Sequence, residues 1–302
     1  FPLAVNLIYY FDSSIWSEIQ LKDLPIDYIP LALLNMFDIY PTGFEGIANG
    51  NLVVSKPSST QQFILDGQMQ LNVQRGNLQQ ILPDLPLASD LKITNSIIQL
   101  NFKDNTISLS SDANVNQGKL LLEGSILASL TNPQYNFNLK GKKIVFEQPH
   151  DGFITLNTEL DISYQDTITD ISGQVDIIDA SYHNQRWQTA LKLPEETTIQ
   201  QDNLSSATAL SHSRYNLKID FGKKTYIHAY GFHGQLQGDL SLTQKANDQR
   251  FLVEGSMYMN DAILLIYGQQ LPLAHCRLNW YQSHLNKPHV DMLIKKTSTV
   301  SS

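Results

Sequence analysis

The sequence predicts a mostly β fold, built from many short antiparallel strands that follow one another in meander order. Apolar and polar residues alternate with a period of two along much of the chain. Turn-forming residues interrupt these runs at the spacing typical of paired strands. Hydrophobic residues make up 42% of the 302 residues and charged residues 17%, which is enough apolar material for a packed interior. At about 12 residues per strand and turn, the chain would hold on the order of 20 strands.

The clearest alternation has one face that is almost wholly apolar and another that is mostly polar, as in a strand with one wetted side. Its apolar residues are Phe63, Leu65, Met69, Leu71 and Val73. A second run of this kind places four residues on one face: Tyr215, Leu217, Ile219 and Phe221. Shorter copies occur at Ile98–Phe102, Tyr135–Leu139 and Val290–Ile294.

Short clusters of Gly, Pro, Asn, Asp and Lys predict the turns between these strands. The clearest are Lys103-Asp104-Asn105, Thr131-Asn132-Pro133, Gly141-Lys142-Lys143 and Asn286-Lys287-Pro288. A glycine also opens several of the alternating runs, which indicates bulges or tight bends in a curving sheet.

Two short apolar stretches, residues 29–37 and 78–85, predict helices that cap an end of the sheet. Neither has the basic polar face of a helix that dips into a membrane. Residues 201–214 are polar, rich in serine and without alternation, so we expect a long loop there. The expected division is therefore a β-rich segment over residues 1–200, this loop, and a second β domain over residues 215–302.

Periodicity leaves open how the apolar face of such a long sheet is covered. A second layer, curling of the sheet into a barrel or trough, and a bound ligand would each remove that face from water.

Charge and hydropathy exclude several classes of function. The net charge is −8 and no cluster of Lys or Arg exceeds a pair, so the basic stripe that nucleic acid requires is missing. The longest apolar candidates, Phe1–Phe11 and Ile26–Ile39, fall short of the about 20 residues that span a bilayer. Because the chain begins at Phe1, we interpret it as a fragment whose membrane anchor, if it has one, lies outside. The single cysteine, Cys276, is expected to be a small buried apolar residue.

No catalytic, cofactor-binding or metal-binding constellation is evident, so an enzyme is the least favoured class. The sequence holds neither a Gly-x-Ser-x-Gly nucleophile motif nor a phosphate-binding loop. His228 and His233 lie five residues apart, a spacing that on one strand would put them on opposite faces and prevent a shared metal. His284 and His289 flank a proline turn and are expected at the surface.

The C-terminal third carries an ordered set of motifs: an alternating strand, a Gly-aromatic pair, two glycine-containing strands, a Tyr-Gly-Gln turn, a strand ending in an aromatic residue, and an Asn-x-Pro turn. These pieces are Tyr215–Phe221, Gly231-Phe232, Gly234–Leu242, Gly255–Met259, Tyr267–Leu271, Leu278–Trp280 and Asn286–Asp291. In order and spacing they resemble the C-terminal domain of the TamB family, the inner-membrane subunit of the translocation and assembly module. The residues between Ala274 and Arg277 depart from the family pattern, which usually has a glycine there. Further upstream, Leu24–Val54 resembles AsmA-like proteins more loosely.

The resemblance implies a long periplasmic β trough, open along one side, in a protein tethered to the inner membrane. It also implies two roles: phospholipid transport to the outer membrane, and assembly of outer-membrane proteins with a barrel partner of the TamA or BamA type. The motif residues to which it gives structural roles are Gly231, Gly238, Gly255, Tyr267, Gly268, Gln269 and Pro288.

Three hypotheses follow, and the first is a hydrophobic groove that carries phospholipid acyl chains between the two membranes. The residues expected to line it are Phe63, Leu65, Met69, Leu71, Val73, Tyr215, Leu217, Ile219, Phe221, Leu236, Leu240, Leu242, Val290, Met292 and Ile294. The second is an interaction module, because an open sheet end offers unpaired N–H and C=O groups to a partner strand. The third, a β-solenoid adhesin or a carbohydrate enzyme built on one, is disfavoured because no repeat of constant period is found.

Overall fold

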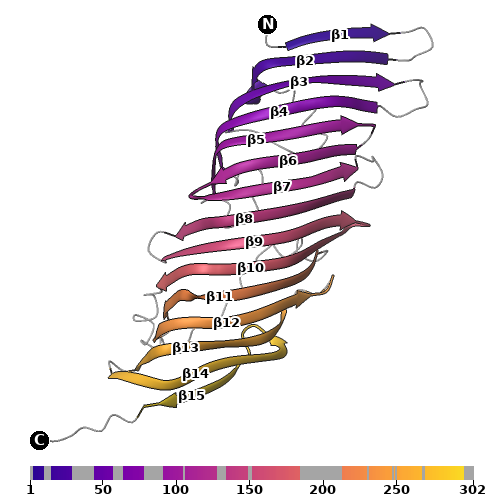
Figure 1. Ribbon diagram of the computed structural model, residues 1–302. Helices are drawn as coiled ribbons and strands as arrows, with labels where there is room; N and C mark the ends of the chain where they lie inside the picture. Colours follow the sequence, from indigo (N-terminus) through magenta and orange to yellow (C-terminus); the bar gives the residue numbers. More distant parts are fainter. Residues whose placement is uncertain are drawn as a thin grey trace, which may run out of the picture. The chain divides into compact units, whose positions relative to one another are not determined.

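The computed structural model describes most of the chain and shows it as β strands joined by turns (Figure 1). The described residues are 3–9, 15–28, 44–56, 64–77, 91–104, 106–127, 134–148, 152–183, 213–229, 231–246, 248, 250–266 and 269–295. The helices predicted over residues 29–37 and 78–85, and almost all of the predicted loop over 201–214, lie outside them.

Fifteen strands form within the described residues, together with one short 3-10 helix, η1 (Ile26–Tyr28). The first eight are β1 (Leu3–Tyr9), β2 (Ile15–Pro25), β3 (Glu45–Lys56), β4 (Ile64–Asn77), β5 (Lys92–Lys103), β6 (Thr106–Val115), β7 (Gly118–Leu127) and β8 (Gln134–Gln148). The remaining strands are β9 (Gly152–Gln165), β10 (Ile168–His183), β11 (Ser213–Ala229), β12 (Phe232–Gln244), β13 (Leu252–Ile266), β14 (Gln269–His284) and β15 (His289–Ile294).

The strand order follows the sequence from β1 to β15, and the order does not return to its first strand. The predicted class, an open, curled antiparallel sheet in meander order, is therefore confirmed. Two compact units make up the chain: Phe1–Phe146 with Glu159–Thr169, and Glu147–Thr158 with Asp170–Ser302. No helix among the described residues is both long enough and apolar enough to cross a membrane.

In the first unit, each strand from β1 to β7 pairs antiparallel with the next one, up to β8. Several of these strands curve along their length, most clearly β3 to β7 (Figure 1). The β6–β7 hairpin closes on two residues, with Val115 opposite Gly118, and Asn116 in this turn has a φ of 51°. The Asn116 side chain accepts a hydrogen bond from the Lys92 N–H and donates one to the Val145 carbonyl, so the turn ties β5 to β8.

The turn predicted at Gly141-Lys142-Lys143 is wrong, because these residues lie inside β8. Gly141 is buried and pairs with Leu120 of β7, so the glycine accommodates a neighbouring strand rather than a chain reversal. The turn after β5, which includes Asp104 with a φ of 55°, is confirmed. The reversal between β14 and β15 at residues 285–288 is also confirmed, and there the Lys287 N–H donates to the His284 carbonyl.

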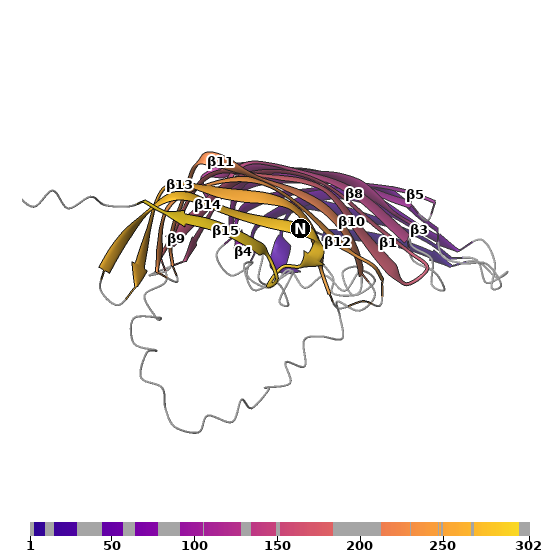
Figure 2. The ribbon, with the colours of Figure 1, turned by 90° about the horizontal axis from the view of Figure 1, so that it is seen from below.

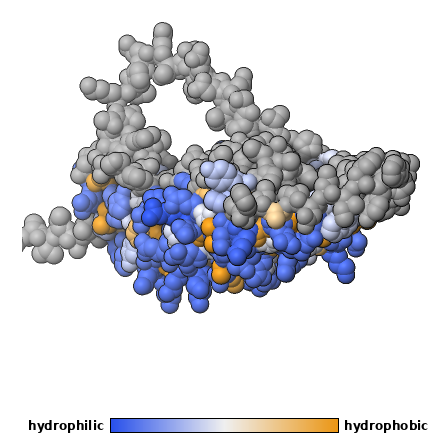
Figure 3. All heavy atoms as spheres, turned by 90° about the horizontal axis from the view of Figure 1, so that it is seen from above, coloured by the Kyte–Doolittle hydropathy of each residue, from blue (hydrophilic) through white to orange (hydrophobic). Residues whose placement is uncertain are grey.

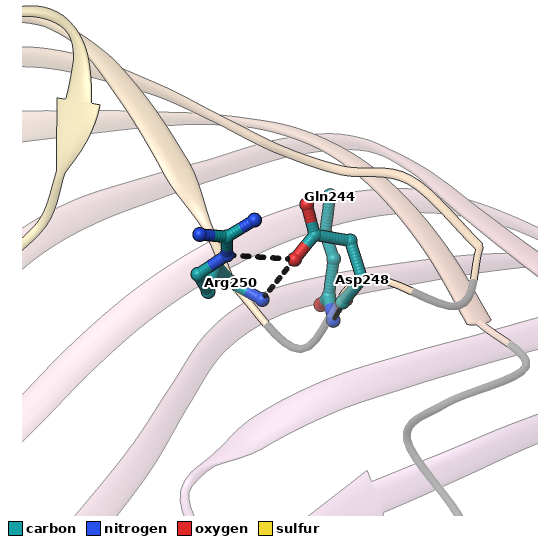
Figure 4. A network of polar contacts seen from close by, with 3 residues as sticks. All are labelled: Gln244, Asp248 and Arg250. Atoms are coloured by element: carbon teal, nitrogen blue, oxygen red, sulfur yellow. Dashed lines mark hydrogen bonds and ion pairs between the residues drawn. The ribbon is translucent and has the colours of Figure 1, made fainter.

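In the second unit, β11 to β15 form an antiparallel meander with a register shift within every pair. Figure 2 shows that these strands bend along their length. Register shifts of this kind raise local twist and bend a strand, so they account for this curvature. The reversal between β12 and β13 is held by polar contacts: the Gln244 side-chain amide donates to the Asp248 carbonyl, and the Asp248 carboxylate accepts from the backbone and the guanidinium of Arg250 (Figure 4). The hydrogen bonds from Arg250 hold the pKa of Asp248 below its usual range.

Candidate functional site

The first unit presents one apolar sheet face that is continuous from β2 to β8. The pairing registers put apolar residues and glycines of successive strands side by side in rows. One row reads Ile19, Leu52, Gly67, Phe102, Ile107, Ile126 and Tyr135, and the next reads Leu21, Gly50, Met69, Leu100, Leu109, Gly124 and Phe137. Because each strand contributes alternate residues to this face, the one-sided pattern seen in the sequence becomes one extended apolar surface.

The opposite face of the first unit is mainly polar. A row of uncharged polar residues crosses it: Gln20, Asn51, Gln68, Asn101, Ser108, Ser125 and Asn136. Cross-strand contacts continue on β8 and β9, where Lys140 pairs with Glu159 at 2.9 Å and Asn138 donates to Asp161 at 2.8 Å. In the space-filling view of Figure 3, the described residues in sight are mostly hydrophilic, with a few hydrophobic ones between them.

The second unit has an apolar face of its own, on β11 to β15. Its rows are Leu217, Leu242 and Val253; Ile219, Leu240, Gly255 and Trp280; and Phe221, Gly238, Met257, Leu278 and Val290. Two groups of buried side chains pack on it. One joins Leu240, Val253 and Trp280, and the other joins Leu236, Met259, Ala262, Leu264, Leu273 and Cys276.

The residues expected to line a groove fall on these two faces, with different degrees of burial. Met69, Val73, Leu236 and Leu240 are buried. The half-buried ones are Leu65, Leu71, Tyr215, Leu217, Ile219, Phe221 and Leu242. Phe63 lies outside the described residues. The register brings the β4 set together in the first unit and the β11–β12 set together in the second.

Every side chain of strand β15 is exposed. The three predicted lining residues on it, Val290, Met292 and Ile294, pair with apolar residues of β14 and so share the apolar face. Leu293 on the other face is 62% exposed. Among the described strands β15 pairs with β14 alone, which leaves an exposed, apolar edge strand at this end of the unit.

Glycines on the apolar rows allow strands and large side chains to approach closely. Gly238 and Gly255 have φ values of 135° and 132°, which side-chain-bearing residues rarely adopt. A Cβ atom at Gly238 would overlap the Ser256 carbonyl oxygen, and one at Gly255 would overlap that of Asp239. Gly255 pairs with buried Trp280 of β14, but the atoms nearest to an added Cβ belong to Asp239 and Leu240, so the strand that approaches closely is β12.

The remaining motif residues lie at or next to the ends of strands β12 to β15. Gly231 has a φ of 80° and its carbonyl accepts from the Leu265 N–H at 2.7 Å, which ties the β11–β12 turn to β13. Gln269 begins β14, and Pro288 comes directly before β15. Tyr267 and Gly268 lie outside the described residues.

The prediction that His228 and His233 occupy opposite faces is wrong. A turn separates them, and they stand directly opposite each other on β11 and β12 with their Nδ1 atoms 2.9 Å apart. A spacing of five residues puts two side chains on opposite faces only when one continuous strand carries both. Gly231 between the two was the signal for the reversal. Even so, no group of three or more His, Cys, Asp or Glu among the described residues is arranged to hold a metal ion.

A pocket of about 310 Å³ lies between β13 and β14, lined in part by Tyr258, His275 and Arg277. These three side chains already have partners. Tyr258 donates to Gln237, Arg277 donates to Ser256, and His275 lies 2.9 Å from an Asp291 oxygen. The polar atoms of Tyr258, His275 and Arg277 are thus engaged in cross-strand contacts and do not form the convergent set of free polar groups that a small ligand requires.

Comparison with known proteins gives one match. The family model of the TamB C-terminal domain matches residues 108–302. Neither the curated proteins nor the solved structures contain a match. The match covers more than half of the 302 residues, and it begins well before the motifs of residues 215–296, within β6. It thus extends over strands of both units, and the chain belongs to the TamB family.

Proposed function

We propose that the apolar faces of the sheet hold the acyl chains of phospholipids, and that the chain acts in the periplasm to carry these lipids between the inner and outer membranes. Membership of the TamB family associates the chain with the translocation and assembly module of the Gram-negative envelope. In this proposal the chain is a non-enzymatic conduit that belongs to a protein anchored in the inner membrane.

The observation that carries the proposal is the one-sided character of the sheet. In the first unit, apolar rows run across seven consecutive strands, β2 to β8, and the strands in the described residues all belong to one sheet. A second sheet layer to cover these rows is thus absent from the described part of the chain. An apolar face without such a layer is the surface that an acyl chain needs.

The energetics favour such binding without specific polar contacts. Transfer of a methylene group from water to an apolar surface contributes about 0.8 kcal/mol, so an acyl chain that covers several rows gains many kcal/mol. Half-buried residues such as Leu71 and Leu217 still expose apolar surface that an acyl chain could cover. Leu52 and Val253 are fully buried and pack beneath the exposed side chains of the face.

Site-specific photo-crosslinking to phospholipid in cells tests the proposal. The crosslinker is placed at neighbouring residues that point to opposite faces: Leu71 and Asn72 on β4, and Leu217 and Lys218 on β11. We expect lipid adducts at Leu71 and Leu217 and none at their neighbours. Equal labelling within each pair, or no adduct at either leucine, would contradict the proposal.

A second function, pairing with a partner strand in outer-membrane protein assembly, is favoured by the exposed β15 edge. Its free side presents backbone donors and acceptors, and exposed apolar side chains such as Leu293 flank them. We propose that a strand of a barrel protein of the TamA or BamA type adds to this edge.

A proline at Met292 tests the edge, and lipid crosslinking on another strand, β11, reports whether lipid binding persists. The Lys295 N–H donates to Pro272 of β14, and N–H directions alternate along a strand, so the Met292 N–H points to the free side. Met292→Pro should therefore reduce capture of the barrel partner while lipid crosslinking at Leu217 persists. Unchanged partner capture would count against the edge.

A further inference from the structure

Three histidines gather at the closed end of the β11–β12 hairpin, on the polar face of the second unit. His228 of β11 stands opposite His233 of β12, with 2.9 Å between their Nδ1 atoms and 5.1 Å between the ring centres. His183, the last residue of β10, stacks on His228 with ring centres 4.8 Å apart and planes inclined by 5°. The His228 side chain of β11 therefore contacts both β10 and β12.

The contact between His228 and His233 depends on their protonation. A hydrogen bond between two Nδ1 atoms needs one ring to donate and the other to accept. A neutral pair, or a pair that shares one added proton, can satisfy this requirement. Two imidazolium rings cannot, because both Nδ1 atoms then carry hydrogen and the two charges repel at short range.

We propose that His183, His228 and His233 form a proton-sensitive clasp, which holds the ends of β10, β11 and β12 together while the rings are neutral and releases them when the cluster takes up protons at mildly acidic pH.

The surroundings of His228 favour its neutral form. Burial, followed by the nearby His183 and His233, lowers the pKa of His228 below its ordinary value of 6.5. The facing titratable groups are thus His183 from β10 and His233 from β12, and the β13 residue that pairs with His233 is uncharged Ile263. No acidic group of the described residues is among the causes that lower this pKa.

The direction of the pH effect follows from this lowered pKa. The unfolded or released hairpin end binds a proton at His228 more readily than the closed one does. The contribution of the clasp to stability is therefore fully present above pH 6.5 and is lost as the pH falls through the lowered pKa. Histidine is the side chain whose ordinary pKa places such a change near physiological pH.

Separation of the strand ends would also affect the apolar face, because the same two strands contribute side chains to it. Ile227 and Phe232, the immediate neighbours of His228 and His233, point to the other side and pack against the buried group that includes Leu236 and Leu264. Loosening of the hairpin end would therefore uncover this end of the apolar face. The clasp does not require a lipid to be bound, so it stands or falls independently of the proposed transport.

Hydrogen exchange of the full chain at pH 7.5 and pH 5.5, corrected for the intrinsic effect of pH on exchange, tests the clasp. We expect several-fold faster exchange at pH 5.5 in the segment 225–236, with no such change in the β6–β7 hairpin, which contains no histidine. His228→Gln should abolish the difference between the two pH values, because the glutamine does not titrate. His289→Gln, at an exposed residue of β15, is the matched control and should retain it.

Equal protection of segment 225–236 at both pH values, or a pH effect that persists in the double variant His228→Gln, His233→Gln, would overturn the proposal. Imidazole NMR of the unmodified chain provides a test that needs no variant to fold. The resonance of His228 should titrate below pH 6.5, and its pKa should rise in His183→Gln. A set of resonances that all titrate at ordinary values would likewise overturn the proposal.

Discussion

At the scale of single residues, the glycines of β12 and β13 show how backbone conformation serves the apolar face. Gly238 and Gly255 adopt φ values that cost other residues free energy, and both stand where an added Cβ atom would overlap a carbonyl oxygen of the facing strand. The family pattern marked both glycines, but the sequence could not show that the reason is a positive φ within a strand.

Gly238→Ala is expected to lower the free energy of unfolding by about 1–3 kcal/mol, because alanine would be strained at this φ and would push against Ser256. Urea denaturation measures this change. Asp239→Ala, at the exposed neighbouring side chain, is the control and should change the free energy by less than about 0.5 kcal/mol. Equal effects of the two substitutions would argue against strain at Gly238.

Cys276 is buried within the apolar group of the second unit, as the sequence predicts for a small apolar residue. Burial, assisted by the carboxylate of Asp291, raises the pKa of the thiol above its ordinary value of 9.0. The thiolate fraction at neutral pH is therefore lower than in an exposed cysteine.

We expect Cys276 in the folded chain to react with a thiol reagent such as DTNB more than about tenfold more slowly than a cysteine placed at exposed Arg277. The absorbance of the thiolate released from the reagent follows the reaction. The rate at Cys276 should still be rising at a pH where that of the Arg277→Cys site has levelled off. Equal rates at Cys276 and at the Arg277→Cys site would show that the Cys276 thiol is accessible.

At the scale of elements, alternation predicted the strands well and their lengths poorly. The described strands β8 to β14 each have 13–17 residues, longer than the pitch of about 12 residues per strand and turn assumed from the sequence. Gly141 and the two lysines after it look like a turn in sequence, yet they remain in β8 because Leu120 of the neighbouring strand pairs with Gly141. The residues around Gly141 in the sequence do not indicate that Leu120 lies beside it.

The register of β11 on β12 is set by which side chains must share the apolar face, since a slip of one residue would turn every side chain to the other face. A disulfide tests it. Lys218 and Ser241 are directly opposite on the polar face, so the pair Lys218→Cys, Ser241→Cys should oxidise readily under mild conditions.

The offset pair Lys218→Cys, Thr243→Cys is the control. Thr243 lies opposite Asn216, so it is diagonal to Lys218, at about 7–8 Å, too far for an unstrained disulfide. Gel mobility with and without reductant distinguishes the two variants. Preferential oxidation of the offset pair would mean that the register is shifted.

At the scale of the whole molecule, the question is whether the apolar faces are a closed core or a surface that receives lipid. A single charged side chain distinguishes the two. An arginine at half-buried Leu217 can extend its charged end toward water and leave an open sheet folded, but it would disrupt the path of an acyl chain.

We therefore expect Leu217→Arg to reduce phospholipid recovered with the purified chain severalfold, while the free energy of unfolding falls by less than about 2 kcal/mol. Mass spectrometry of extracted lipid and denaturation measure the two effects. Asn216→Arg introduces the same charge on the polar face and should change neither. Global unfolding of Leu217→Arg alone would instead indicate a tightly packed, closed core.

The sequence by itself determined the all-β class, the one-sided strands and the family, because these depend on side-chain alternation and on motifs that lie along the chain. It also placed Leu217, Ile219, Leu240 and Leu242 on apolar strand faces, and the register then brought them side by side. Only the tertiary structure showed that β15 is the exposed last strand of the described sheet and that His183, His228 and His233 meet. Pairing between strands decides both features. Gly231 signals the reversal between His228 and His233, but no local signal links His228 to His183, which lies far earlier in the chain.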